Sequence, residues 1–459
     1  GGTNWVSFGD NFHADNHTLF FHPQNSDIVL EGNDGGLYYS LDGGSTFTHF
    51  DNLPNSQFYT CEVDPQNPTN LYGGLQDNGT YRTQTGNIND WEMINGGDGF
   101  YVLVDPTDNS IIYSESQYGG FGFGSTGIDF SDRFNWSTPF VFNPQNSASL
   151  FLGSDKMYKT TDRANTWSAI SSDLTNGPSQ GNLPYGTITT IAVAPSDSNT
   201  IYAGTDDANV WVTQNSGTTW TKISDSLPHR WITRLAVDNF NSQVAYVTIS
   251  GYRWGENIGH LYRTTNAGIQ WKDISSNLPD APFNDIIVDE QRDSTLYLAS
   301  DVGVFMTKNL GRSWQVLGND LPNVVVNDLK FHNPTRTLVA ATYGRSMYKI
   351  NVDSVTTSVV SNDMSIPNYS LEQNYPNPFN ATTSIRYSLS NRGIVSLKVY
   401  DVDGKEVATL VNYKELESGK HQTTFDANRL ASGIYFYRIS IERNGCQNYN
   451  ETKKLLLLK

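Results

Sequence analysis

One short pattern recurs along the first 350 residues, and this repetition restricts the folds that the chain can adopt. Each unit has an alternating run that ends in DP or a close variant, then a segment of the type xNxxxLYxG and a second short run. The first half of the unit occurs eight times between about residue 17 and residue 352, for example as CEVDPQNPTNLYGG and IAVAPSDSNTIYAG. A period of roughly 40 residues is typical of proteins built from similar units that pack side by side.

The second half of the unit is an eight-residue turn that ends in an aromatic residue. It occurs as SLDGGSTF, TTDRANTW, TQNSGTTW, TTNAGIQW and TKNLGRSW. Asp or Asn at the third position can accept backbone N–H groups of the turn, while the aromatic ring can pack between neighbouring sheets. We therefore predict a structural role for Asp42, Asp162, Asn215, Asn266 and Asn309, and for the closing aromatics Phe47, Trp167, Trp220, Trp271 and Trp314.

These turns resemble the Asp box, or BNR repeat, whose pattern is SxDxGxTW and which occurs in sortilin-type and xyloglucanase-type propellers. Four short strands per unit are what a propeller blade requires. We predict an all-β, eight-bladed propeller in which an N-terminal strand around Trp5 completes the last blade and closes the ring. Seven blades are the alternative if the Gly-rich third unit is an insertion and not a blade. Because residue 1 falls inside a repeat, we also expect that a longer chain preceded it.

The pattern stops after Val352, which predicts a second domain. Residues 353–370 form a polar segment rich in Ser and Thr, which is typical of a linker. Residues 371–459 have the strand-like runs TTSIRYSL, VSLKVYDV, KEVATLV, HQTTFDA, GIYFYRISI and TKKLLLLK. They also have the size of an immunoglobulin-like β-sandwich. They hold 12 basic and 9 acidic side chains, a net charge of +3, so the rest of the chain carries −20. We therefore expect a propeller at 1–352, a linker at 353–370 and a sandwich at 371–459.

Four motifs of the last segment point to export. They are NYPNPFN, VSLKVYDVDGKEVATLV, LASGIYFYRI and the terminal KKLLLLK. In this order they resemble the C-terminal sorting domain of type IX secretion substrates in Bacteroidetes and related phyla. The resemblance implies that the type IX machinery is a partner, that the protein reaches the outer-membrane surface or the medium, and that the sorting domain is often cleaved.

Several classes of function are disfavoured by composition. The net charge of −17 repels nucleic acids. Two cysteines cannot build a disulfide framework, and the run LLLL is far shorter than the ~20 residues of a membrane span. The chain has no GxSxG, P-loop or HExxH motif.

The strand order of a propeller meander places particular loops on one face, around the mouth of the central channel. On that face we expect the aromatic and basic side chains that would bind a ligand. These candidates are Trp136, Trp231, Tyr252, Trp254, Tyr343 and Arg345.

The same face is expected to carry Asp34, Asp77 and Asp98, which are the candidates for catalysis. Two carboxyl groups could act as the acid and base pair of a glycoside hydrolase. The segment GNDGGLYYS is similar to the strand that carries a catalytic Asp in xyloglucanase-type enzymes, and this resemblance would give Asp34 that role. A sialidase is disfavoured because the arginines are scattered and no FRIP-like segment precedes the first unit.

A divalent cation, calcium or zinc, is the only cofactor that the sequence suggests. His13, Asp15 and His17 alternate in HADNH, so in extended backbone all three would point to one side. A hydrogen-bonded pair of histidines at the channel mouth is the simpler explanation.

The sequence thus favours a secreted propeller that binds an extracellular polysaccharide or surface protein, or that serves as a scaffold. A glycoside hydrolase of the xyloglucanase-like class is the alternative, and catalysis itself stays open. Function on a widespread fold has to be argued from a site, and no complete catalytic site can be recognised in the sequence.

Overall fold

The structure is a computed structural model that describes residues 13–457 except 179–184, 257, 319, 355–369, 375, 390–391, 403 and 444–445. The chain divides into two units, Gly1–Thr356 and Thr357–Lys459, and the boundary falls inside the predicted linker. Strands dominate both units, as predicted, with two short 3-10 turns at Tyr252–Trp254 and Asn333–Thr335. Among the described residues, no helix has the length and apolar character needed to span a membrane.

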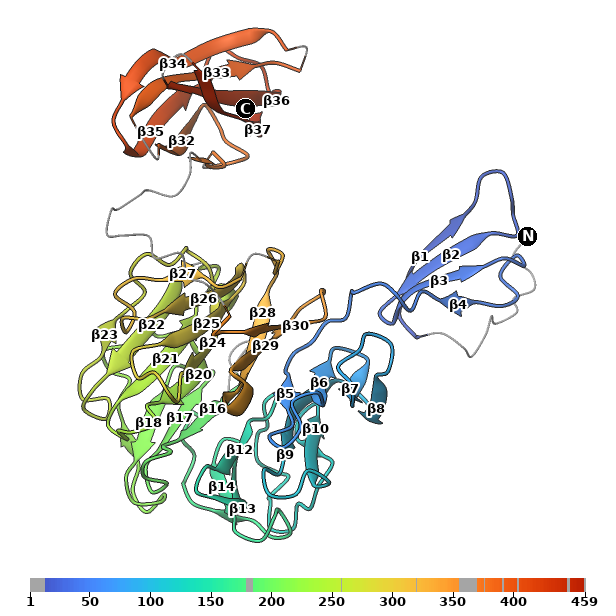
Figure 1. The fold of residues 1–459 in the computed structure, drawn as a ribbon, viewed down its shortest axis with the longest axis vertical. Coiled ribbons are helices and arrows are strands. Elements are labelled where there is room, and N and C mark those ends of the chain that lie inside the picture. The colour runs from blue at the N-terminus through green and yellow to red at the C-terminus, as the bar shows by residue number, and fades with distance from the viewer. Residues whose placement is uncertain are drawn as a thin grey trace. The chain divides into compact units, whose positions relative to one another are not determined.

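The first unit consists of antiparallel sheets that are each a meander of consecutive strands (Figure 1). Its described strands, sheet by sheet, are β1 (Asn16–Phe21), β2 (Val29–Asn33), β3 (Gly36–Ser40) and β4 (Thr48–His49); β5 (Glu62–Val63), β6 (Leu71–Leu75), β7 (Gly79–Thr83) and β8 (Glu92–Asn95); β9 (Gly99–Val104), β10 (Ile112–Ser116) and β11 (Gly120–Phe121); β12 (Phe140–Asn143), β13 (Asn146–Gly153), β14 (Met157–Thr160) and β15 (Ser168–Ala169); β16 (Ile188–Val193), β17 (Ile201–Thr205), β18 (Val210–Thr213) and β19 (Thr221–Lys222); β20 (Trp231–Val237), β21 (Ala245–Ser250), β22 (Gly259–Thr264) and β23 (Lys272–Asp273); β24 (Phe283–Val288), β25 (Leu296–Ser300), β26 (Gly303–Thr307) and β27 (Gln315–Val316); and β28 (Val326–His332), β29 (Thr337–Thr342) and β30 (Met347–Asn351).

The core of this unit lies between adjacent sheets. The second strand of a sheet, such as β17, β21 or β25, is buried along its whole length. The tyrosine of the repeated LYxG segment occupies this strand, and Tyr202, Tyr246 and Tyr297 are fully buried. Burying one such ring contributes about 1.5–3 kcal/mol, so the repeat conserves the packing contact that holds each blade to the next.

The Asp boxes close turns between the third and fourth strands. In all five, the Asp or Asn at the third position accepts the backbone N–H of the seventh residue, at 2.8–3.0 Å. Each closing Trp donates its indole N–H to a carbonyl of the preceding sheet, as Trp220 does to Ile170 at 3.0 Å. The boxes therefore fix both the turn and the contact between sheets.

Side-chain to backbone hydrogen bonds join the innermost strands of consecutive sheets. Asn284, on β24, donates to the carbonyl of Val326 on β28 at 2.9 Å. Asn327, on β28, donates at 2.9 Å to the carbonyl of Phe58, which leads into β5. The last sheet is thus bonded to the β5–β8 sheet in the same way as β24 is bonded to β28, and Asp328 adds a 3.0 Å bond to the N–H of Cys61.

These contacts favour the seven-bladed alternative over the expected ring of eight. Sheet β28–β30 packs directly on sheet β5–β8 through a shared apolar cluster that includes Phe58, Cys61, Val339 and Ala341. That contact leaves no place between them for β1–β4. The expected closing strand around Trp5 lies outside the described residues. The ring closes instead through residues just before β5, where Gln57 forms a β-bridge with Tyr343.

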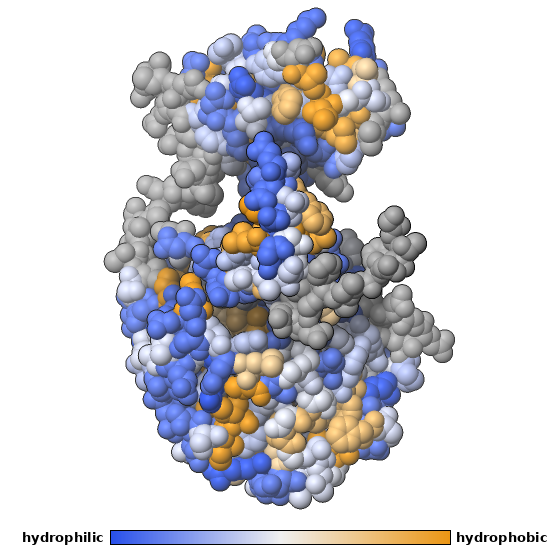
Figure 2. Space-filling model, turned by 90° about the vertical axis from the view of Figure 1, so that its right-hand side faces the viewer, coloured by the Kyte–Doolittle hydropathy of each residue, from blue (hydrophilic) through white to orange (hydrophobic). Residues whose placement is uncertain are grey.

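Sheet β1–β4 keeps the Asp box but exposes apolar residues. Leu19, Phe20 and Phe21, on its edge strand β1, are 56%, 53% and 55% exposed. Apolar residues project from both faces of this strand, since neighbouring side chains alternate. Figure 2 views the molecule from this side and shows hydrophobic residues in separate patches between hydrophilic ones.

The second unit is a β-sandwich. One sheet contains β31 (Ser370–Leu371), β32 (Thr382–Leu389) and β35 (Gly419–Asp426), and the other contains β33 (Gly393–Tyr400), β34 (Glu406–Leu416), β36 (Gly433–Arg443) and β37 (Cys446–Leu457). Alternating side chains of both sheets, among them Ile385, Val399 and Tyr437, meet in one buried core. Each run that the sequence predicted as a strand here overlaps an observed strand.

Candidate functional site

The turn between β6 and β7 is the centre of the candidate site. It consists of Gln76, Asp77 and Asn78, and Asp77 has a φ of 58°, in the left-handed region that Asp tolerates better than most residues. Asn78 donates to the carbonyl of Asp34 at 2.9 Å, which ties this turn to the β2–β3 turn. The fold thereby brings residues that are more than 40 positions apart to one place.

The three candidate aspartates meet at this turn. The Asp98 carboxylate accepts the backbone N–H of Asp77 at 2.9 Å. Asp34 lies close enough to Asp77 for its charge to act on the Asp77 carboxyl group. Asp34 also contacts the ring of His17. Asp98 therefore stabilises the turn, and Asp34 and Asp77 are neighbours beside it.

The pKa of Asp77 is raised. Burial is the largest cause, followed by the nearby charges of Asp98 and Asp34, although the amide of Gln76 acts in the opposite direction. Nearby negative charges disfavour ionisation, so Asp77 keeps its proton to a higher pH than a free Asp does. Its carboxyl group can accept a hydrogen bond from a ligand, and it can donate one when it is protonated.

The metal prediction assumed extended backbone through His13, Asp15 and His17, and the structure does not have this backbone at Asp15. Asp15 has a φ of 59°, so the three side chains do not share one side of an extended strand. His13 bonds the carbonyls of Ala14 and Asp77 at 2.9 and 2.8 Å, and His17 contacts Asp34. Within the described part of the chain, no three His, Cys, Asp or Glu side chains are grouped so that they could hold a metal.

An aromatic wall stands beside the two neighbouring aspartates. Tyr59, just before β5, donates to Gln76 at 3.0 Å, and Tyr343, just after β29, contacts the same amide oxygen. The ring of Tyr59 stacks on Phe100 at 4.8 Å, and Phe100 meets Trp136 edge-on at 5.7 Å. Four separate segments therefore supply one aromatic surface.

Two neighbours extend this wall. Tyr118, which is 52% exposed, packs edge-on against Trp136 at 4.9 Å. Arg345 follows Tyr343 and bonds the carbonyl of Gly344 at 3.0 Å. The wall thus has a buried base at Phe100 and an exposed rim.

The other predicted aromatic residues form a second cluster, on the sheet β20–β23 and the loop before β16. The guanidinium of Arg253 lies over the ring of Trp231 at 4.4 Å and over Tyr185 at 5.5 Å. Trp254 lies under the guanidinium of Arg230 at 5.8 Å, and Tyr252 is 68% exposed.

A charged network crosses the interior of the ring. Arg234, on β20, contacts Asp285 on β24 at 2.8 Å and Asp328 on β28 at 2.5 Å. It also donates to the hydroxyl of Tyr101 on β9 at 2.8 Å. Residues from four sheets are therefore joined by one arginine.

Lysine and glutamate complete this network. Lys330 contacts Asp328 at 3.1 Å. Burial raises the pKa of Glu62 to about 7, against the attraction of Lys330. Burial likewise raises the pKa of Asp285 to about 6, although the Arg234 charge opposes it. These shifts arise because ionised groups lose water, and the network holds them at the ring centre.

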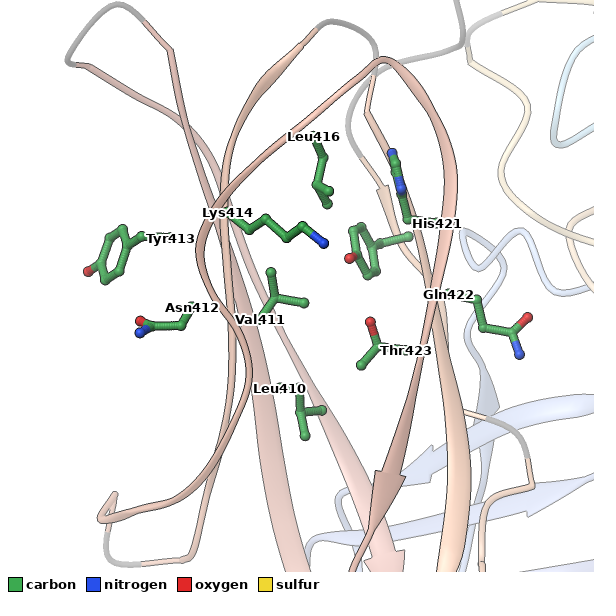
Figure 3. A pocket seen from close by; sticks show the side chains of 10 residues that line it. Leu410, Val411, Asn412, Tyr413, Lys414, Leu416, His421, Gln422 and Thr423 are labelled. Carbon is green, nitrogen blue, oxygen red and sulfur yellow. The ribbon is translucent and has the colours of Figure 1, made fainter.

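The sandwich has a cavity of about 600 Å³ between β34 and β35. Figure 3 shows the side chains of Val411 and Lys414 pointing into it from β34, with His421 and Thr423 on the side of β35. The labelled Tyr413 points away, into solvent.

The structure therefore divides the predicted site residues between two places. The aspartates, Trp136, Tyr343 and Arg345 belong to the first, and Trp231, Tyr252 and Trp254 to the second. Sequence reasoning missed Tyr59, Gln76 and Tyr185 and did not single out Arg253. Tyr59, Trp136 and Tyr185 all lie just before the innermost strand of a sheet, β5, β12 and β16 respectively. This shared position could have identified Tyr59 from the sequence.

A family model matches the second unit, whereas similarity to solved structures extends over most of the chain. A comparison with curated proteins found no match. Among solved structures, the extracellular domain of a hybrid two-component system from B. thetaiotaomicron is 12% identical, with a TM-score of 0.49, over 99% of this chain and 63% of that one. The GH74 xyloglucanase from Xanthomonas campestris is 14% identical, with a TM-score of 0.40, over 93% and 66%. YCF48 from Cyanidioschyzon merolae is 12% identical, with a TM-score of 0.39, over 74% and 96%.

The chain spans less than two thirds of the length of the first and second of these structures. Residues 373–456 match the family model described as a secretion system C-terminal sorting domain. This match covers nearly the whole sandwich and agrees with the four sequence motifs. The C-terminal unit is therefore a secretion system C-terminal sorting domain, and type IX export takes this protein to the cell surface or the medium.

Proposed function

We propose that the propeller binds a polysaccharide outside the cell, at the aromatic wall beside the β6–β7 turn. Sugars present apolar C–H faces together with hydroxyl groups, so they suit sites that combine aromatic rings with a few fixed polar groups. Tyr59, Tyr343 and Trp136 supply the rings, and Gln76 and the two neighbouring aspartates supply the polar groups.

The convergence of these rings is the observation that supports the proposal most. Tyr59, Phe100, Trp136 and Tyr343 come from four segments and meet on one amide, that of Gln76, or on one another. Only Phe100 is fully buried, so the other rings keep exposed surface for a ligand.

A binding experiment tests the proposal. Affinity electrophoresis of the full chain in a panel of neutral polysaccharides should show retardation by at least one of them. Tyr343→Ala and Trp136→Ala should each weaken that binding about tenfold, because losing a stacked ring costs roughly 1.4 kcal/mol.

The matched control is Phe240→Ala. Phe240 is 69% exposed and lies in the β20–β21 turn, at the other end of the sheets. It should bind like the unmodified protein. Equal losses in Phe240→Ala and Tyr343→Ala, or no retardation in any polysaccharide, would count against the site.

A glycoside hydrolase remains the second candidate because Asp77 has a raised pKa beside Asp34. A raised pKa suits a general acid. However, the carboxyl groups of glycosidases stand about 5 Å apart in retaining enzymes and further apart in inverting ones, and the third aspartate, Asp98, is engaged by the turn backbone. Release of reducing ends that is abolished in Asp77→Asn but kept in Phe240→Ala would decide for the enzyme.

A further inference from the structure

Arg253 is held between aromatic rings and has no carboxylate partner among the described residues. Its guanidinium lies over Trp231 at 4.4 Å, and its Nη1 donates to the Tyr185 hydroxyl at 3.5 Å. Tyr185 meets Trp231 edge-on at 6.3 Å, so the two rings form a corner around the guanidinium. An arginine fixed in this way loses little freedom when it binds, since its planar fork is already oriented.

Glu256, the acidic residue nearest to Arg253 in the sequence, is paired with other basic side chains. Glu256 contacts Arg230 at 2.7 Å and His260 at 3.3 Å. Burial raises the pKa of Glu256, but these contacts outweigh it and lower the pKa overall. The charge of Arg253 is therefore not cancelled by Glu256. A positive site thus stands in a part of the chain whose net charge is −20, and an anion entering there would contact the exposed guanidinium of Arg253.

Exposed rings beside this arginine suit a sugar. Tyr252 and Trp254 flank Arg253 in the 3-10 turn and are 68% and 39% exposed. Their rings offer flat apolar surface next to the charge. A ligand that fits both features has a pyranose face and a carboxylate on the same ring.

We propose that the cluster of Arg253, Trp231, Tyr185, Tyr252 and Trp254 binds uronic acid residues of an acidic polysaccharide, with the carboxylate on Arg253. The guanidinium would take the carboxylate through two parallel N–H···O bonds, a geometry that Arg provides and Lys does not. This inference goes beyond the proposed function, because it concerns a second set of residues, separate from the aromatic wall, and a charged sugar.

The test measures by biolayer interferometry how tightly the full chain binds two polymers. One is polygalacturonate and the other is the same polymer with its carboxyl groups reduced to alcohols. We expect at least tenfold tighter binding to polygalacturonate, and weakening as the salt concentration rises from 0.05 to 0.5 M. Arg253→Gln should lose about tenfold in affinity, and Arg253→Lys should recover only part of it.

Arg312→Gln is the matched control, since Arg312 is exposed in the Asp-box turn at the other end of the sheets. It should bind like the unmodified protein. Equal affinity for both polymers, or equal binding by Arg253→Gln and Arg312→Gln, would overturn the inference. Poly-glutamate that binds as tightly, with the same dependence on Arg253, would show that the ligand is an acidic peptide and would also overturn it.

Thermal melting of each variant shows whether it is folded. A Trp231→Phe variant keeps a ring under Arg253 and should retain most of the affinity for polygalacturonate. Binding of neutral polysaccharide tests the proposed function separately from this inference. Tyr343→Ala that loses neutral polysaccharide but keeps polygalacturonate would confirm two sites. If neutral binding survives while polygalacturonate binding is absent, only this inference fails.

Discussion

At the scale of single residues, the Asp boxes show how one turn tolerates two side chains. Asp162 accepts the hydroxyl and the backbone N–H of Thr166, at 2.6 and 2.9 Å. Asn215 accepts the N–H of Thr219 at 2.9 Å in the same way but donates to its hydroxyl instead. A threonine hydroxyl can either donate or accept, so its rotation accommodates the exchange.

Asp162→Asn should therefore leave the melting temperature at pH 7 close to that of the unmodified protein, whereas Asp162→Ala should lower it. The bonds from Thr166, first, and then from Thr160 lower the pKa of Asp162 from 3.8 to about 2. A depressed pKa stabilises the fold above pH 4, and this contribution is lost as the pH falls from about 4 to about 2. Melting curves between pH 2 and 7 should show the Asn variant gaining on the unmodified protein over that interval. An Asn variant as unstable as the Ala variant would refute the explanation.

At the scale of strands and turns, the sequence predicted local structure better than ring closure. The run TTSIRYSL coincides with β32, because alternation of apolar and polar residues is a local property. The contacts of the last sheet favour seven blades over the expected eight, because closure depends on which distant sheets meet. No spacing in the sequence indicates that Asn327 would reach Phe58. The metal prediction likewise assumed extended backbone, whereas Asp15 has a φ of 59°.

Asn327→Ala tests the closing contact. It removes the bond to the Phe58 carbonyl and leaves that carbonyl in a packed interface, which should cost about 1–2 kcal/mol of unfolding free energy. Asn323→Ala, at an exposed position just before β28, should cost close to nothing. Urea unfolding followed by tryptophan fluorescence gives both values. Similar losses for the two variants would show that the bond does not contribute to closure.

At the scale of the whole molecule, the chain joins a propeller to a unit that directs export. The sandwich core is made of residues of the second unit. Charge also separates the two, at −20 before residue 371 and +3 after it. The aspartates, Trp136 and Tyr343 were expected on one face from the sequence, but Tyr59 and Phe100 were not, and the meeting of these side chains needed the tertiary structure.

Deleting residues 373–456 should retain the protein inside a host that has a type IX system, while the full chain reaches the surface or the medium. The reason is that this segment matches the sorting-domain family. Immunoblots of cell and culture fractions measure the distribution. A deletion of the first four strands, residues 13–49, serves as the control and should still be exported. Equal export of the truncated and full chains would contradict the assignment.

The bond from Asn327 to Phe58 joins residues that are 269 positions apart. A ribosome that adds 5–20 residues per second needs roughly 13–54 seconds to cover that stretch. During this time the face of the β5–β8 sheet that will receive Val339 and Ala341 has no partner. Such long-range pairing makes folding slow. The nascent chain consequently passes through an open arc whose first sheet exposes apolar residues, and the ring cannot close until the last sheet has been made.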